Sequence, residues 1–293
     1  MRLGGIEAGG TKFICGIGDE TGNILERINF PTTTPEETMK QALSFFKSKK
    51  LDAIGIGSFG PVDLDKTSPT YGYITSTPKQ HWNNYNILGE LKKHLSIPIA
   101  FDTDVNAAAL GEMEWGAAQD VDSCIYITVG TGIGVGAIVE GKLLHGMSHP
   151  EMGHILVRTH PEDSFEGNCP FHQHCLEGMA AGPAIEKRWG KRAAELEHEE
   201  KVWRMEAFYL AQALMNYILT LSPKKIIMGG GVMKQRQLFP LIYEQLHELL
   251  NNYVKLKHLD QYIIAPGLED NAGLCGALAL AKREVLLTTL HNK

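Results

Sequence analysis

Apolar and polar residues alternate along the chain with two different periods, and this pattern predicts a mixed α/β protein. Short apolar runs bounded by turn residues indicate buried strands, whereas apolar residues that recur roughly every three to four positions indicate helices. The predicted strands are residues 13–17, 24–30, 53–59, 97–101, 125–129, 226–228 and 263–265, with further strands after residue 136 through Val139 and at Leu143–Leu144. The predicted helices are residues 35–48, 202–221, 238–251 and 272–287, with an alanine-rich helix that follows residues 102–106 and ends near Trp115.

The pattern also repeats on a larger scale. Each half of the chain opens with a predicted β-hairpin that carries glycine and threonine at its turn, and then alternates helices and strands. Such a repeat predicts two related α/β domains with a cleft between them. We expect a first domain at residues 1–115, a second at 116–270, and a closing helix at 271–293 that packs back toward the first.

Composition restricts the class of protein. A hydrophobic fraction of 43% and a charged fraction of 21% are ordinary for a soluble protein, and a net charge of -6 argues against nucleic acid as a partner. No apolar run approaches the ~20 residues of a membrane helix, and the first residues do not resemble a signal peptide. We therefore expect a cytoplasmic protein without membrane or nucleic-acid partners. An odd number of cysteines does not suggest a disulfide framework, so Cys15, Cys124 and Cys275 are expected to be buried thiols.

Histidine and cysteine are concentrated in one part of the chain. Six of the twelve histidines lie within residues 145–174, and two of the five cysteines lie beside them. Between Cys169 and Cys175, two residues separate each cysteine from the histidine in the middle, a spacing typical of zinc ligands. A structural zinc site is therefore expected, with a fourth ligand across a loop. Its predicted ligands are His154, Cys169, His172 and Cys175. His174 is a rival to His172, and the alternative without a metal is a set of solvated loop histidines.

Two glycine–threonine turns and a third glycine run are candidates for phosphate binding. Glycine lets backbone N–H groups approach an anion closely, and a threonine hydroxyl adds a donor. Neither turn has the spacing of a P-loop or of a dinucleotide fingerprint, and each alone is equally compatible with a structural hairpin. Together they favour a nucleotide that is held by both domains. The candidate residues are Gly9, Gly10, Thr11, Lys12, Thr131, Gly132, Gly229, Gly230 and Gly231.

Asp104 follows a predicted strand and begins a predicted helix. A carboxylate in this position either caps the helix or faces a cleft, and capping is the alternative for Asp102, Asp104 and Asn106 alike. The functional interpretation is a general base that takes a proton from a substrate hydroxyl, as phosphoryl transfer requires. Because this transfer otherwise depends on positioning and charge neutralisation, we also expect Mg²⁺ bound to the nucleotide phosphates.

Several segments together match one known family pattern. They are Val129-x-x-Gly132-Ile133-Gly134-x-Gly136-Ala137, the segment Asp104–Glu112, Glu151-x-Gly153-His154, and Gly146 and Pro150 at the family's spacing. With these residues the chain resembles the ROK family (repressors, open reading frames and sugar kinases) over essentially its whole length. The resemblance implies the two-domain actin-like, ribonuclease-H-like α/β fold of the hexokinase–actin superfamily, with an active site between the domains. The helix-turn-helix of the repressor members is missing from the sequence, so the chain looks like a kinase member.

The resemblance also implies roles for single residues. Asp104 matches the catalytic base that activates the 6-hydroxyl of a sugar. Glu151, His154 and Glu177 match positions that hold sugar hydroxyls, with His154 also turned toward zinc. The residues that match the two phosphate turns and the adenosine-side turn are Thr11, Lys12, Thr131, Gly132 and Gly229 to Gly231.

The chain departs from the family pattern at three places. Glu7 replaces an aspartate of many members, and its extra methylene is expected to alter the metal–water shell. Thr103 replaces an asparagine that contacts the sugar, and His172 replaces a cysteine ligand, a change that zinc tolerates. Thr103 and the loop Thr77–Asn83 resemble the fructokinase branch of the family.

The expected activity is therefore ATP- and Mg²⁺-dependent phosphorylation of the 6-hydroxyl of D-fructose, which yields fructose 6-phosphate and ADP. A structural zinc ion and a homodimer are implied by the same resemblance. Two alternatives stay open: a kinase for glucose, mannose or N-acetylmannosamine, and a sugar-sensing regulator without catalysis.

Overall fold

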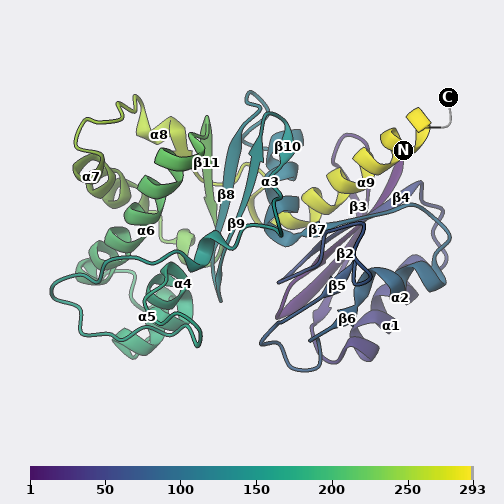
Figure 1. Ribbon diagram of the computed structural model, residues 1–293, viewed down its shortest axis with the longest axis horizontal. Helices are drawn as coiled ribbons and strands as arrows, with labels where there is room; N and C mark the ends of the chain where they lie inside the picture. Colours follow the sequence, from purple (N-terminus) through teal and green to yellow (C-terminus); the bar gives the residue numbers. More distant parts are fainter. Residues whose placement is uncertain (292–293) are drawn as a thin grey trace. The chain divides into compact units, whose positions relative to one another are not determined.

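The computed structural model describes residues 1–291, and these form two compact units (Figure 1). Unit 1 comprises Met1–Asp120, Lys142–Pro150 and the chain from Gly267 onward. Unit 2 comprises Val121–Gly141 and Glu151–Pro266. The domain limits expected from the sequence stay a prediction, and they contain no counterpart to the short segment Lys142–Pro150 that is grouped with unit 1.

The sheet of unit 1 combines antiparallel and parallel strands. In spatial order its strands are β3 (Ile24–Pro31), β2 (Lys12–Asp19), β1 (Arg2–Ala8), β4 (Ala53–Ser58) and β7 (Ile99–Thr103). The pairs β1–β2 and β2–β3 are antiparallel, whereas β1–β4 and β4–β7 are parallel. Parallel strands end at the same edge of a sheet, so the segments that follow β1, β4 and β7 lie along one edge. A separate small hairpin is formed by β5 (Tyr73–Ile74) and β6 (Tyr85–Asn86).

Helices contact the unit 1 sheet at several strands. These helices are α1 (Pro35–Phe46), α2 (Ile87–His94), α3 (Asp104–Trp115) and α9 (Ala272–His291), and the short 3₁₀ helix η4 (Glu269–Asn271) precedes α9. Close approach of α9 requires glycine in the strands, because a methyl group at Gly55 would collide with the carbonyl oxygen of Ala277. Methyl groups at Gly5 and Gly16 would likewise press on Leu274. Within the apolar core, the backbone of α9 therefore packs directly against the backbone of β4.

The sheet of unit 2 begins with the second predicted hairpin. Its strands pair in the order β9 (Ile133–Val139), β8 (Cys124–Val129), β11 (Lys225–Gly229) and β12 (Ile263–Ile264), and β10 (Lys142–Leu143) follows β9 in the chain. The β8–β9 pair is antiparallel, and β11 runs parallel to both β8 and β12. The helices are α4 (Leu176–Ala180), α5 (Gly182–Trp189), α6 (Glu200–Leu221), α7 (Leu238–Leu250) and α8 (Leu259–Tyr262), with 3₁₀ turns η1 (Met152–His154), η2 (Ala193–Glu195) and η3 (Val232–Lys234).

Most elements lie where the apolar pattern predicts them, including both glycine–threonine hairpins. The sequence prediction missed α2, α4, α5 and α8, which are too short to show a helical period. All five cysteines lie in the described chain as buried thiols outside any disulfide, as expected for Cys15, Cys124 and Cys275. Among the helices of residues 1–291, none has the length and continuous apolar character that crossing a bilayer requires.

Glu206 is an ionisable residue in the interior of unit 2. It lies in α6, is 1% exposed, and neither carboxylate oxygen has a hydrogen-bond partner among residues 1–291. Burial raises the pKa of Glu206 well above its usual value, and the guanidinium of Arg188 opposes this only in part. Arg188 is itself paired with Asp163, its Nε lying 3.1 Å from Oδ2. Glu206 therefore retains its proton in the folded protein over a pH range in which the unfolded chain releases it.

This retained proton predicts how stability depends on pH. Between the ordinary glutamate pKa of 4.5 and the raised folded pKa, the folded state binds more protons than the unfolded state, so the free energy of unfolding falls as pH rises. One such group contributes a slope of about 1.4 kcal/mol per pH unit in that window. Glu206→Gln should remove this slope, and urea unfolding at a series of pH values measures it. Glu248→Gln, on the exposed side of α7, is the control and should follow the wild type. If the free energy of unfolding changed with pH in the same way for Glu206→Gln and the wild type, the prediction would be contradicted.

Candidate functional site

The carboxyl edge of the unit 1 sheet brings two of the predicted segments to neighbouring positions. Ala8 at the end of β1 pairs with Ser58 of β4, and Ser58 pairs with Thr103 at the end of β7. The turn Gly9–Lys12 follows Ala8, and Asp104 follows Thr103. The first phosphate candidate and the candidate base therefore leave the same sheet edge, on either side of β4.

The turn Gly9–Lys12 is closed by its own backbone and open to solvent. The amide of Gly9 donates to the carbonyl oxygen of Lys12 over 3.1 Å, and Thr32 Oγ1 donates to the carbonyl of Gly9 over 2.6 Å. A methyl group at Gly10 would meet no atom within 4 Å, and Thr11 and Lys12 are exposed. This arrangement leaves space and donors for an anion beside the turn.

Asp104 is the first residue of α3 and is half-buried against the sheet. A methyl group at Gly57 of β4 would lie 3.2 Å from its Cα. Thr103 Oγ1 accepts the capping hydrogen bond from the amide of Asn106 over 3.1 Å, and Asp104 Oδ1 accepts from the amide of Val105 over 2.9 Å. Thr103 is therefore the N-cap residue, and it is only 4% exposed. The capping of α3, which was the alternative role for Asp104, is therefore performed by Thr103.

Unit 2 brings its two glycine segments together because β8 and β11 are parallel neighbours. The turn after β8 is closed by a hydrogen bond from Gly130 N to Gly132 O of 2.9 Å. After β11, Gly230 has a φ of +91°, and a methyl group there would collide with Val129. A methyl group at Gly130 would lie 4.0 Å from the amide nitrogen of Gly231, while one at Gly231 itself would meet no atom within 4 Å. The two segments thus share one open surface. Thr131 is exposed on this surface, whereas Gly229 is buried.

Glu177 connects this surface to the histidine–cysteine loop. Its Oε2 accepts a hydrogen bond from the amide of Ile133 over 2.9 Å, directly after Gly132, and its Oε1 lies 3.9 Å from Nε2 of His154. Partial burial, and to a lesser extent the charge of Glu177, raises the pKa of Glu151. Glu151, His154 and Glu177, three of the four predicted sugar-binding residues, therefore lie near one another in unit 2.

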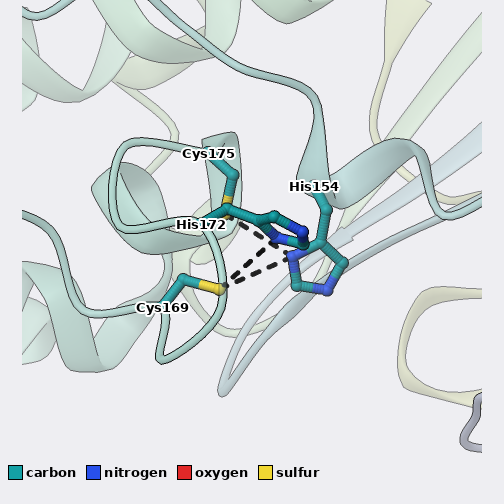
Figure 2. A group of neighbouring side chains, drawn as sticks. All are labelled: His154, Cys169, His172 and Cys175. Carbon is teal, nitrogen blue, oxygen red and sulfur yellow. Dashed lines mark hydrogen bonds between the residues drawn. The ribbon is translucent and has the colours of Figure 1, made fainter.

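Four side chains of unit 2 point toward one another as a metal site requires (Figure 2). They are His154, Cys169, His172 and Cys175, and their ligand atoms all lie within 4.8 Å of one another. From Cys169 Sγ, the Nδ1 atoms of His154 and His172 are each 3.8 Å away, and Cys175 Sγ is 3.5 Å from His154 Nδ1. Ligands at zinc bonding distances form a tetrahedron with edges of about 3.6 Å. The donor set and its spacing therefore fit zinc, and His174, the rival to His172, is outside this group.

Burial raises the pKa of Cys175 above that of an ordinary thiol, with a smaller contribution from neighbouring Cys169. A bound cation has the opposite effect on a thiol, because it favours the thiolate. Cys175 also caps α4, where the amide of Gly178 donates to its sulfur over 3.3 Å, and Glu177 lies in the first turn of that helix. A metal held by Cys175 would thus fix the start of the helix that carries Glu177.

Three residues of unit 1 that make long-range hydrogen bonds were not identified from the sequence. His145 Nε2 lies 2.8 Å from Asp102 Oδ2, and His149 Nε2 accepts a hydrogen bond of 3.0 Å from the amide of Val62. Glu112, fully buried, accepts hydrogen bonds from backbone amides far along the chain. The two histidines belong to the histidine-rich stretch, but their partners are distant in sequence.

Known proteins match this chain over nearly its whole length. The ROK family pattern matches residues 3–284. A protein of Bacillus subtilis (strain 168) is 57% identical over 283 residues, 95% of each chain, and a fructokinase of Pediococcus pentosaceus is 48% identical over 282 residues, 96% of this chain and 98% of its own. Among solved structures, a ROK hexokinase from Thermus thermophilus has a TM-score of 0.81 at 27% identity, covering 98% of this chain and 99% of its own. These matches confirm the predicted fold class, and the chain belongs to the ROK family.

Proposed function

We propose that this protein is an ATP-dependent fructokinase that converts D-fructose to fructose 6-phosphate and ADP. One observation carries the choice of sugar. Four relatives named fructokinase are 44% to 48% identical over at least 92% of the chain, whereas two named glucokinase are 26% and 28% identical. A ROK glucokinase from Streptomyces griseus, with a TM-score of 0.79 at 26% identity, was solved with glucose and AMPPNP, which supports ATP as the phosphoryl donor.

In this proposal Asp104 is the catalytic base. Its carboxylate accepts the proton of the sugar 6-hydroxyl as the oxygen attacks the γ-phosphorus of ATP, and the bond to the β-phosphate oxygen breaks. Asp104 lies at the N-terminus of α3, where the helix dipole favours a negative charge. Thr103, and not Asp104, is the N-cap residue of α3.

The nucleotide is proposed to bind through the glycine turns. Amides and hydroxyls of Gly9 to Lys12 and of Thr131 and Gly132 would contact phosphate oxygens, and Gly229 to Gly231 would lie at the adenosine side. The open space beside Gly10 and Gly231 supports this assignment. Mg²⁺ would neutralise phosphate charge when bound. Glu7 could hold its hydration shell, since Glu7 Oε2 is buried without a hydrogen-bond partner among the described residues.

The sugar is proposed to bind through Glu151, His154, Glu177 and Thr103. Zinc held by His154, Cys169, His172 and Cys175 would be structural, since all four positions of a tetrahedron are taken by protein ligands. Its proposed effect is to fix His154 and the start of α4 so that the sugar-holding carboxylates keep their places. We also propose that the protein is cytoplasmic, as its sequence led us to expect, and that it is a homodimer, as the family resemblance implies; sedimentation of the purified protein tests the dimer.

A panel of sugars tests the proposed substrate. With saturating ATP and Mg²⁺, coupled ADP release should give the highest kcat/KM for D-fructose, by about 10-fold or more over glucose, mannose and N-acetylmannosamine. A site that hydrogen-bonds one pattern of hydroxyls leaves polar groups unpaired with the others, and this lowers their kcat/KM. A higher kcat/KM for another sugar would replace fructose by that sugar, and absence of ADP release with every sugar would favour the non-catalytic regulator.

A further inference from the structure

Asp102 is a buried carboxylate beside the proposed base. It is 4% exposed, and both of its oxygens accept hydrogen bonds. Oδ1 accepts from the amide of Thr103 and from Nδ2 of Asn106, each over 2.8 Å. Oδ2 lies 2.8 Å from Nε2 of His145. Because a carboxylate only accepts, Nε2 of His145 carries the proton in this contact.

Asp104 lies midway in the sequence between Asp102 and Asn106, whose side chains are hydrogen-bonded to each other. The bond between Asp102 and Asn106 connects the end of β7 to the first turn of α3, and one residue separates Asp104 from each of these two partners. The capping bond from Asn106 N to Thr103 closes the same turn from inside. The backbone around Asp104 is thus held by a closed set of hydrogen bonds among Asp102, Thr103 and Asn106, and His145 donates to that set from another part of the chain.

The segment that carries His145 is attached to unit 1 at a second point. His149 is buried, and its Nε2 accepts from the amide of Val62, so this nitrogen has no proton and the ring is neutral. The turn between the two histidines is closed by a 2.8 Å hydrogen bond from Gly146 N to Ser148 O. The two histidines therefore have opposite roles: His149 fixes the segment to the chain that follows β4, and His145 donates to Asp102 at the end of β7.

We propose that His145 is a positioning residue, which acts through Asp102 to hold Asp104 in the orientation that accepts the sugar proton. The inference rests on the proposed function, since it assumes that Asp104 is the base. A misplacement of about 1 Å in such a group can lower a rate by about 100-fold, so one distant hydrogen bond can control turnover without touching the sugar.

The charge of His145 adds a testable pH dependence. The hydrogen bond to Asp102 raises the pKa of His145, against the opposing effect of partial burial. Other titratable groups that interact with this pair are His149, whose pKa burial lowers, and Tyr71, whose pKa is raised by burial and to smaller extents by Glu284 and Asp102. Because the folded pKa of His145 is raised, the stabilising ion pair is complete below the ordinary histidine pKa and is lost as pH rises through the folded one.

Two substitutions and a matched control test the inference in the full-length protein. His145→Leu removes the donor, whereas His145→Gln keeps an amide N–H that can replace Nε2. The control is His94→Leu in α2, which also removes a histidine paired with a carboxylate, since His94 Nε2 lies 3.3 Å from Glu90 Oε1. We expect His145→Leu to lower kcat for fructose by about 10- to 100-fold with KM for fructose and ATP nearly unchanged. His145→Gln, which keeps a donor without the charge, should lose less, to the kcat that the wild type reaches above the His145 pKa, and His94→Leu should stay near the wild type.

The pH profile of kcat separates positioning from a merely structural role. The wild-type profile should contain a fall as pH rises through the His145 pKa, and His145→Gln should lack this step. If His145→Leu fails to fold, the profile of His145→Gln still decides, and an unchanged profile overturns the inference. A His145→Leu enzyme with wild-type kcat also overturns it. The same holds if the only change is a rise in KM for fructose. An inactive wild type would instead overturn the proposed function, together with the inference that depends on it.

Discussion

Asp104→Asn is expected to lower the kcat of fructose phosphorylation by about 10²- to 10⁴-fold while leaving the affinity for fructose nearly unchanged. Asparagine has almost the same shape as aspartate and can still accept the hydrogen bond from the amide of Val105, but it cannot take up the hydroxyl proton. Thr103 continues to cap α3, so the fold should be preserved. Steady-state kinetics measure kcat, and calorimetric titration of fructose measures the affinity.

The matched control for this change is Asp260→Asn. Asp260 is likewise an aspartate in the first turn of a helix, α8, but it lies in unit 2 and is none of the residues proposed to bind sugar, nucleotide or metal. This variant should retain wild-type kcat and fructose affinity. Full activity of Asp104→Asn would remove Asp104 as the base, and an equal loss in both variants would indicate a general effect of the substitution.

Loss of a zinc ligand is the change with the largest expected effect on stability. The purified protein should contain about one zinc ion per chain, and His172→Asn and Cys175→Ser should each lose it. Loss of a structural metal removes several kcal/mol of folding free energy, and each kcal/mol corresponds to about 2–4 °C in Tm for a chain of this size. We therefore expect Tm to fall by about 5 °C or more, with weaker fructose binding because His154 and α4 lose their shared anchor.

His174→Asn is the control for the zinc substitutions, since His174 is an exposed histidine of the same loop and outside the group. It should keep the zinc, the Tm and the activity. Metal content by atomic absorption, with Tm by calorimetry before and after chelation, checks all variants. Zinc bound by His172→Asn but not by His174→Asn would reverse the assignment, and unchanged Tm after verified zinc loss would remove the structural role.

The sequence predicts elements best where local chemistry and burial agree. The first helix begins where Thr34 and Pro35 predict, and Thr34 does accept from the amide of Glu37, over 3.4 Å. In contrast, α2 was missed although Asn86 caps it in the same way, since its Oδ1 accepts from the amide of Gly89 over 2.7 Å. Its eight residues follow a long polar loop, and so short an apolar repeat cannot be told from a loop by period alone.

The candidate site shows the same limit. Spacing points to Cys169 and Cys175 and, being even about His172, favours His172 over His174, but it does not settle the choice between the two histidines. That choice depends on the loop conformation, in which Gln173 has a φ of +47° and Gly178 packs against its carbonyl oxygen. The composition of the loop thus reveals the chemistry, whereas the backbone path selects the ligand.

Long-range hydrogen bonds were beyond the reach of any local pattern. Asp102 and His145 are 43 residues apart, and nothing in either segment signals the other. Glu112 accepts from the amide of Ala117 nearby and from the amides of Gly267 and Leu268, which are 155 and 156 residues away. These buried carboxylates satisfy backbone or side-chain donors that only the assembled unit 1 brings to them, so their roles are visible only in the structure.

The most direct test of the central proposal is the identity of the product. Phosphorus NMR of a reaction containing the protein, ATP, Mg²⁺ and D-fructose should show ADP and fructose 6-phosphate forming in equal amounts, with neither appearing in the Asp104→Asn reaction at matched times. Phosphate on a different hydroxyl, ADP accompanied only by inorganic phosphate, or no turnover of ATP would contradict the account.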